Sequence, residues 1–169
     1  MNAMRFNASY GLAVKAITIA VFLILAFVNA VFLALCLREG APIYLFLFML
    51  VFSTAFMALS YAFSPRRYEL TKSELVVRRA LRCIGIPYHK VTEVKPLSSL
   101  SLKSIRLFGM GGLFGFYGLY YVSGLGRLWL YITKWKNLVL VKAVDKSYVL
   151  SPDDREGFIK ALSDMLTHR

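Results

Sequence analysis

The residues of this chain that could take part in catalysis or bind a metal are few and widely spaced. His89 stands beside Lys90, and His168 is the penultimate residue. Neither histidine has a Cys, Asp or Glu at the spacing of a metal site or a catalytic triad. Cys36 and Cys83 form neither a metal-binding motif nor a disulfide pattern. We therefore expect no catalytic residues, no metal, no cofactor, no small-molecule substrate and no enzymatic activity.

Residues 109–115 contain four glycines and resemble a nucleotide-binding loop at first sight. The third glycine of the dinucleotide-binding pattern would fall on Phe114, and no strand–helix–strand pattern surrounds the segment. The Lys-Ser/Thr pair that ends a phosphate-binding loop is also missing from it. We therefore do not expect this segment to bind a nucleotide.

Residues 106–126 combine seven glycines with six aromatic residues. Glycines permit bulges and sharp bends, so the aromatic side chains could fill the core of a small, strongly curved sheet. Alternatively, some of them are exposed and dip into a membrane interface or bind a protein partner. This candidate partner surface comprises Phe114, Phe116, Tyr117, Tyr120 and Tyr121. Burial of all of the last four would exclude the second alternative.

The chain is basic, with a net charge of +12, and the charge is concentrated after residue 64. Residues 65–169 hold 18 Lys and Arg against 8 Asp and Glu. Such a domain beside a bilayer would be attracted to anionic lipid headgroups, although cytoplasmic flanks of membrane proteins are generally basic. No recognition helix or base-stacking motif points to nucleic acid. The candidate lipid-facing basic patch comprises Arg66, Arg67, Lys72, Arg78, Arg79 and Arg82.

Two long apolar segments must position these residues. Residues 16–37 and 43–63 contain no charged residue, and residues 38–42 join them. Each segment would be a helix of about 30 Å, the thickness of the hydrocarbon core of a bilayer. Residues 1–64 therefore predict a transmembrane hairpin. A cleaved signal peptide fits poorly, because the first segment is too long and ends in Leu35-Cys36-Leu37, where small residues would be needed.

The orientation of the hairpin follows from the charges that flank it. Arg5 and Lys15 precede the first segment, Arg66 and Arg67 follow the second, and the connecting loop holds only Arg38 beside an acidic residue. Positive residues favour the cytoplasmic side. We therefore expect a multi-pass protein of the cell (inner) membrane with both termini in the cytoplasm.

Residues 65–169 have the length of one small domain. Short β-prone segments separated by turns continue to residue 150, which predicts antiparallel strands. A helix is expected over about 152–167, with Ser151 as its N-cap and Pro152 in its first turn. Its apolar residues, at the spacing of one helix face, would pack on the curved sheet: Phe158, Ile159, Leu162, Met165 and Leu166.

Several short motifs in residues 68–162 make a resemblance specific. They are Tyr68-Glu69-Leu70-Thr71, Ile86-Pro87-Tyr88 with Val91, Arg106-Leu107-Phe108-Gly109 through Gly112-Leu113-Phe114-Gly115 to Gly118, Tyr131-Ile132-Thr133, Asn137-Leu138-Val139-Leu140, and Ser151-Pro152 with Phe158. In these residues the chain resembles the bacterial pleckstrin-homology-like (PH-like) domain family, in the branch that follows a transmembrane hairpin. The resemblance implies a mainly-β PH-like barrel or sandwich closed by a C-terminal amphipathic helix.

The resemblance also implies scaffolding and interaction roles rather than catalysis. Pleckstrin-homology domains that bind phosphoinositides carry a Lys followed later by Lys/Arg-x-Arg. Residues 78–82 here contain no Arg-x-Arg, so inositol lipid binding does not carry over. We expect a membrane-anchored interaction or assembly module at the cytoplasmic face, with a protein partner or a second copy of the chain. The alternatives are a sensor of anionic lipid that uses the basic patch, and an accessory subunit of a membrane enzyme or transporter.

Overall fold

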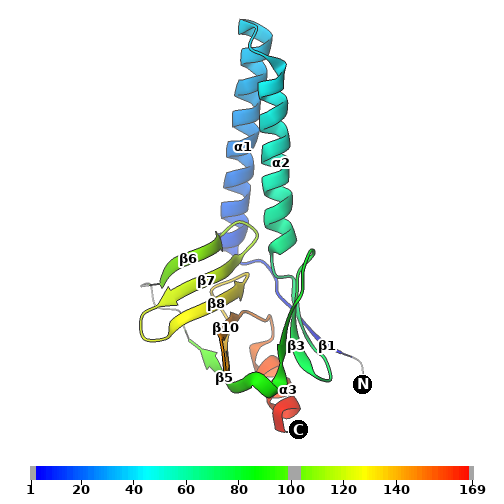
Figure 1. Cartoon of the computed structure of the whole chain (residues 1–169), viewed down its shortest axis with the longest axis vertical. Helices are drawn as coiled ribbons and strands as arrows, with labels where there is room; N and C mark the ends of the chain where they lie inside the picture. Colours follow the sequence, from blue (N-terminus) through cyan, green and yellow to red (C-terminus); the bar gives the residue numbers. More distant parts are fainter. Residues whose placement is uncertain (1–2, 99–103, 168–169) are drawn as a thin grey trace.

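The computed structural model describes residues 3–98 and 104–167, and His168 lies outside them. Two long helices project together from one end of a mainly-β domain (Figure 1). Helix α1 spans Leu12–Glu39 and helix α2 spans Ile43–Phe63. Gly40 ends α1 in the left-handed conformation, at φ 66°, which lets the chain reverse direction within a few residues.

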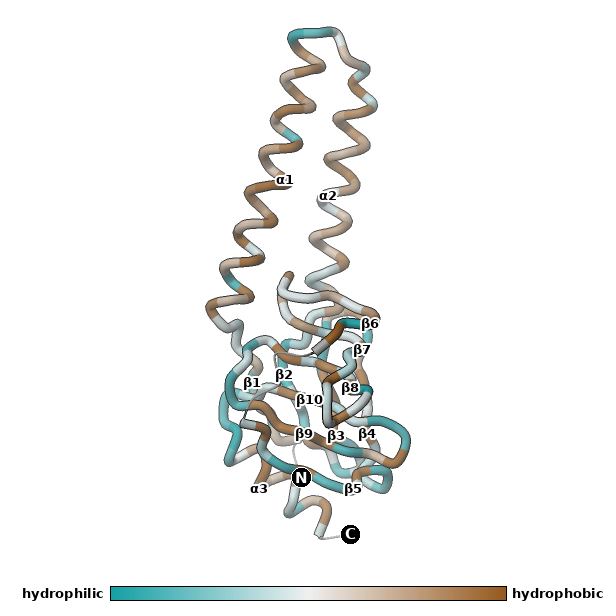
Figure 2. The backbone as a smooth tube through the Cα atoms, turned by 90° about the vertical axis from the view of Figure 1, so that its left-hand side faces the viewer, coloured by the Kyte–Doolittle hydropathy of each residue, from teal (hydrophilic) through white to brown (hydrophobic). Residues whose placement is uncertain are grey.

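Both helices consist mostly of hydrophobic residues along their whole length (Figure 2). Almost none of these side chains is buried, in contrast to the core helices of soluble domains. Helix α1 is about 42 Å long and α2 about 31 Å, so each could span a bilayer. Helix α1 begins at Leu12, four residues before the predicted apolar segment, and its first turn lies against the domain, where Val14 is buried.

The first sheet has four antiparallel strands in the order β1-β2-β3-β4. They are β1 (Met4–Asn7), β2 (Arg67–Leu70), β3 (Glu74–Arg78) and β4 (Ile84–Pro87). Strand β1 precedes the hairpin in sequence but pairs with β2, which follows the hairpin. Strand β1 was not expected from the sequence, and its pairing with β2 ties residues 4–7 into the domain.

The second sheet has six strands in the order β5-β9-β10-β8-β7-β6, and all pairs are antiparallel except β10 with β8. The short helix η1 (Tyr88–Lys90) connects the two sheets and contains His89. The strands are β5 (Val91–Leu97), β6 (Ser104–Gly111), β7 (Phe116–Val122), β8 (Gly126–Ile132), β9 (Leu138–Ala143) and β10 (Ser147–Leu150). The two sheets do not close into a barrel, so the domain is a sandwich with helix α3 (Arg155–Thr167) packed on it.

The predicted apolar face of α3 is confirmed, because Phe158 and Leu162 are fully buried in the core between the sheets. The predicted N-cap is wrong. The helix begins at Arg155, and Asp154 caps it by accepting the Gly157 N–H at 2.9 Å. Ser151 is buried and accepts the Thr133 N–H at 2.9 Å instead. Its hydroxyl therefore joins the end of β8 to the end of β10.

Candidate functional site

The domain is attached to the base of the helical hairpin by several hydrogen bonds as well as by the chain itself. The Tyr117 hydroxyl donates to the Ser60 carbonyl at 2.9 Å, and the Leu81 N–H donates to the Ala62 carbonyl at 3.1 Å. Helix α1 takes part as well, because Thr18 Oγ1 accepts a backbone N–H of the glycine-aromatic segment at 3.1 Å. The strands therefore keep one orientation relative to the helices.

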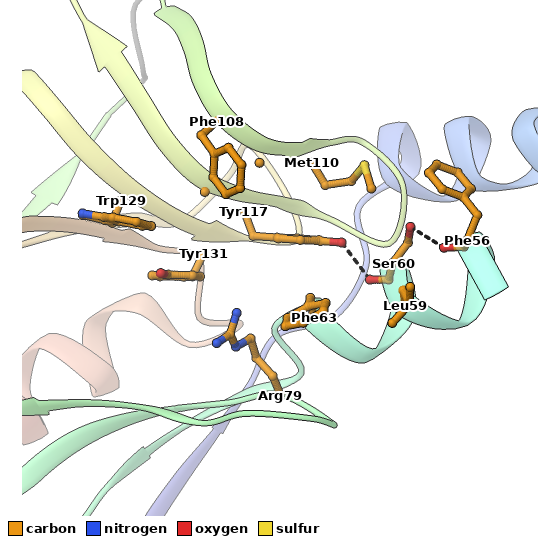
Figure 3. A pocket seen from close by; sticks show the side chains of 12 residues that line it. Phe56, Leu59, Ser60, Phe63, Arg79, Phe108, Met110, Tyr117, Trp129 and Tyr131 are labelled. Carbon is orange, nitrogen blue, oxygen red and sulfur yellow. Dashed lines mark hydrogen bonds between the residues drawn. The ribbon is translucent and has the colours of Figure 1, made fainter.

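A cavity of about 510 Å³ lies at this junction, between the last two turns of α2 and strands β6, β7 and β8 (Figure 3). Its walls are almost entirely apolar. The side chains that line it include Leu59, Phe63, Phe108, Tyr117, Trp129 and Tyr131. Phe108 of β6 is 75% exposed and Leu59 of α2 is 55% exposed, so the cavity is open to the outside beside both elements.

Two glycines that face each other across β6 and β7 form part of the cavity wall. Gly109 and Gly118 both have positive φ, at 118° and 130°, and they are paired in the ladder. A Cβ on Gly118 would lie 2.2 Å from the Phe108 carbonyl oxygen, so no other residue fits there. Glycines were expected from the sequence to permit bends in this sheet. This glycine pair lies next to such an irregularity, the bulge between Arg106 and Phe108.

A second cavity of about 450 Å³ adjoins the first and is basic. Arg79, Arg82 and Lys146 line it. Arg79, Trp129 and Tyr131 line both cavities, so the two adjoin each other along these side chains. The apolar cavity lies beside the transmembrane-type helix, and the basic cavity lies next to it, between the β3–β4 segment and strands β8 and β10.

Arg79 stands where the two cavities meet. Its guanidinium carbon lies 5.6 Å from the centre of the Phe63 ring and 5.7 Å from that of Tyr131, and its Nε donates to the Arg82 carbonyl at 2.6 Å. Burial lowers its pKa, although an arginine stays charged in proteins. Among the described residues, no carboxylate forms an ion pair with Arg79.

The structure divides the predicted basic patch into three parts. Arg79 and Arg82 lie at the cavities, and the Arg66 guanidinium packs 4.3 Å from the Tyr61 ring at the end of α2. Lys72 lies in the β2–β3 turn, at the opposite end of β2 from the hairpin.

Arg67 and Arg78 form the third part of the predicted basic patch, and both form ion pairs with the Glu69 carboxylate. Their Nε atoms lie 3.1 Å and 2.6 Å from the Glu69 carboxylate, and Arg5 approaches it to 3.6 Å. Glu69 is only 3% exposed because these arginines cover it. Hydrogen bonding to Glu69 raises the pKa of Arg78. The sequence offered no sign of this cluster, because Arg5 belongs to a strand that pairs across the whole hairpin.

The five predicted aromatic residues do not share one exposed face. Tyr117 and Tyr120 are buried, whereas Tyr121 is 47% exposed. Phe114 packs on Tyr61 at the hairpin base, with ring centres 5.3 Å apart. Phe116 packs on Trp135, with ring centres 4.7 Å apart.

Sequence analysis missed the apolar side chains that are exposed on β6. Ile105, Leu107 and Phe108 are 64%, 51% and 75% exposed. Strand β6 is last in the described order of its sheet and lies beside the hairpin base in Figure 1. The spacing of Ile105 and Leu107 was the available signal in the sequence, because residues i and i+2 of a strand point to the same face.

His89 is exposed, in η1. In residues 3–98 and 104–167, no group of three or more His, Cys, Asp or Glu side chains is placed to hold a metal ion.

A comparison with models of known families matches residues 66–166 to the bacterial PH domain. Searches of curated proteins and of solved structures found no match. The matched region begins just after α2 and includes strands β2 to β10 and nearly all of α3, but not β1. PH-like domains are generally non-catalytic interaction modules. The chain, with two apolar helices in front of that region, belongs to the bacterial PH domain family.

Proposed function

We propose that this protein is a non-catalytic, membrane-anchored interaction module whose domain faces the cytoplasm and binds anionic lipid of that leaflet. One observation carries the proposal. Arg66, Arg79 and Arg82 gather where α2 ends and the domain begins. A hairpin that spans the bilayer would hold these three cations at the level of the lipid headgroups.

The surroundings of these arginines support contact with a membrane. Leu81, between Arg79 and Arg82, is 64% exposed, and its backbone is held against the end of α2. An apolar side chain flanked by cations is typical of a surface that rests on a bilayer. Each well-placed cation near an anionic surface contributes about 1 kcal/mol, so three would favour contact of the domain with an anionic over a neutral surface by about 100-fold at low ionic strength.

The proposal is tested on the full chain reconstituted in vesicles of mixed phosphatidylcholine and phosphatidylglycerol. Electron paramagnetic resonance of trace spin-labelled lipids measures which headgroup is enriched in the immobilised lipid around the protein. We expect the phosphatidylglycerol label to be enriched, and the enrichment to fall as salt screens the exposed charges. The double variant Arg66→Gln/Arg82→Gln should lose most of it. The matched control Lys72→Gln/Lys160→Gln removes two charges away from the hairpin exit and should keep it.

Equal immobilisation of both labels in the unaltered protein would contradict anionic lipid as the partner. A second candidate, assembly with another copy of the chain, is favoured by the exposed apolar residues of β6. A strand at a sheet edge can pair with a strand of another molecule. Disulfide cross-linking of the Leu107→Cys variant in membranes tests this contact, with Lys160→Cys on α3 as the control position.

A further inference from the structure

The two adjoining cavities at the hairpin base differ in chemistry, because one is apolar and the other is basic. We infer that together they bind one anionic phospholipid, with an acyl chain in the apolar cavity and the phosphate at Arg79. This inference rests on the proposed function only in placing the hairpin base at the membrane surface. It goes beyond that function because it assigns a single bound molecule to a site, rather than a general attraction of headgroups to exposed charge.

The apolar cavity suits an acyl chain in its location as well as its lining. Leu59 and Phe63 belong to the last two turns of α2, and Leu59 is 55% exposed, so the cavity is open on a side of α2 that would face the hydrocarbon core if the hairpin spans a bilayer. Its volume of about 510 Å³ lies in the range of ligand-binding pockets. An acyl chain could therefore move from the bilayer into the cavity without crossing water.

The basic cavity suits a phosphate. Arg79 is partly buried against Phe63 and Tyr131 and has no ion pair with a described carboxylate. A partly buried cation is unfavourable until an anion accompanies it. Arg82 and Lys146 line the same cavity and add positive charge around the position of the headgroup. Lys146 lies 5.5 Å from the Trp129 ring, on the wall that the two cavities share.

Other ligand classes would use only half of this site. A soluble anion would leave the apolar cavity empty, and an uncharged apolar molecule would leave Arg79 without an anion. A chain that enters from the bilayer exchanges one apolar environment for another and so gains little free energy by the transfer. The affinity must therefore come from the headgroup, and it should distinguish anionic from zwitterionic lipid.

Trp129 reports occupancy directly, because it lines both cavities. The chain has two tryptophans, so the Trp135→Phe background isolates its fluorescence. The full chain is reconstituted in mixed vesicles in which either the phosphatidylglycerol or the phosphatidylcholine carries brominated acyl chains, which quench nearby tryptophan. We expect stronger quenching by the brominated phosphatidylglycerol. Because Arg79 is partly buried, this difference should persist at salt concentrations that abolish the enrichment around the protein as a whole.

Two variants locate the site, each with a matched control. Arg79→Gln should remove the difference in quenching between the two headgroups, and Lys72→Gln, the loss of one distant charge, should keep it. Phe108→Asp places an anion at the edge of the cavity and should weaken quenching by phosphatidylglycerol. Ile105→Asp makes the same change on an equally exposed position of β6 that does not line the cavity, and should have no effect. Both Asp variants alter exposed residues, so the test does not depend on whether Arg79→Gln folds.

Equal quenching by the two brominated lipids, or none by either, would overturn the inference. This result is distinguishable from failure of the proposed function. Enrichment of spin-labelled phosphatidylglycerol without selective quenching of Trp129 would leave the general attraction and reject the bound lipid. Selective quenching of Trp129 without general enrichment of phosphatidylglycerol would support the bound lipid and reject the general attraction.

Discussion

The hydroxyl of Tyr68 joins three parts of the domain inside its core, and its removal should be costly. Tyr68 is fully buried on β2. Its hydroxyl donates to the Tyr131 carbonyl at 2.6 Å and accepts the Ser151 N–H at 3.1 Å. It therefore connects the first sheet to strand β8 and to the segment that enters α3.

The variant Tyr68→Phe keeps the ring and removes both hydrogen bonds. A buried donor left without an acceptor, here the Ser151 N–H, costs about 1–3 kcal/mol of unfolding free energy. In a domain of this size each kcal/mol lowers the melting temperature by about 4–8 °C. We therefore expect a decrease of about 4–24 °C at neutral pH, measured by near-ultraviolet circular dichroism of the full chain in detergent micelles.

The same hydroxyl predicts a pH dependence. Burial raises the pKa of Tyr68 to about 12, from 10.0 for an exposed tyrosine. Because the folded-state pKa is the higher one, the stability it contributes is present below about pH 10 and is lost between about pH 10 and 12. The wild-type protein should therefore lose more stability than Tyr68→Phe across this interval, and the difference between their melting temperatures should narrow.

The control is Tyr121→Phe, which removes the same atom from a side chain that is 47% exposed. It should melt within a few degrees of the wild-type protein, since exposed substitutions change stability by about 0.5 kcal/mol or less. Equal melting temperatures for the two variants would refute the assignment of a structural role to the Tyr68 hydroxyl. A gap between wild type and Tyr68→Phe that stayed constant from about pH 10 to 12 would refute the explanation from burial.

Three further predictions concern other parts of the molecule. Hydrogen bonds from Lys142 and Lys95 lower the pKa of the Glu93 carboxyl from 4.5 to about 2. The ionised carboxylate therefore stabilises the fold above about pH 4.5, and this contribution is lost as the pH falls to about 2. Glu93→Gln should flatten the acid side of the plot of melting temperature against pH, and an unchanged plot would count against these ion pairs. Cys83 is exposed on the domain, and the variant Cys36→Ser leaves it as the single cysteine. A membrane-impermeant maleimide should label this variant in inverted membrane vesicles but not in intact cells, and the reverse pattern would place the domain outside the cell. Gly118→Ala should destabilise the protein by about 3 kcal/mol or more, because a Cβ there meets the Phe108 carbonyl at positive φ. Gly124→Ala, with positive φ but open space around it, should cost only about 1–2 kcal/mol in the same melting experiment.

Local patterns in the amino-acid sequence were enough to predict the elements whose structure depends on near neighbours. The two apolar helices follow from segments of more than 20 residues without charge. The face of α3 that carries Phe158 and Leu162 follows from their helical spacing. The family resemblance, too, rested on short local motifs, and the match over residues 66–166 confirms it.

Features that depend on contacts between distant residues were not predictable in this way. Strand β1 pairs with a strand some 60 residues later, on the other side of the hairpin. Ser151 had the composition and position of an N-cap, but the alignment of β8 beside β10 gives its hydroxyl a different partner, the Thr133 N–H. The six predicted basic residues are close in sequence but do not form one group in space. Strand β2 runs away from the hairpin, so Lys72 lies at the end of the strands opposite Arg79.

The cavities arise only when the two sheets and α2 are brought together. No single segment contains their lining, which comes from α2, the β3–β4 connection, the first residue of β4 and four strands of the second sheet. Whether a tyrosine of β7 is buried, as Tyr117 is, or exposed, as Tyr121 is, depends on strand register and on the bulge in β6. Register and bulges are decided by pairing across the sheet, and so the chemistry of the candidate site belongs to the tertiary structure.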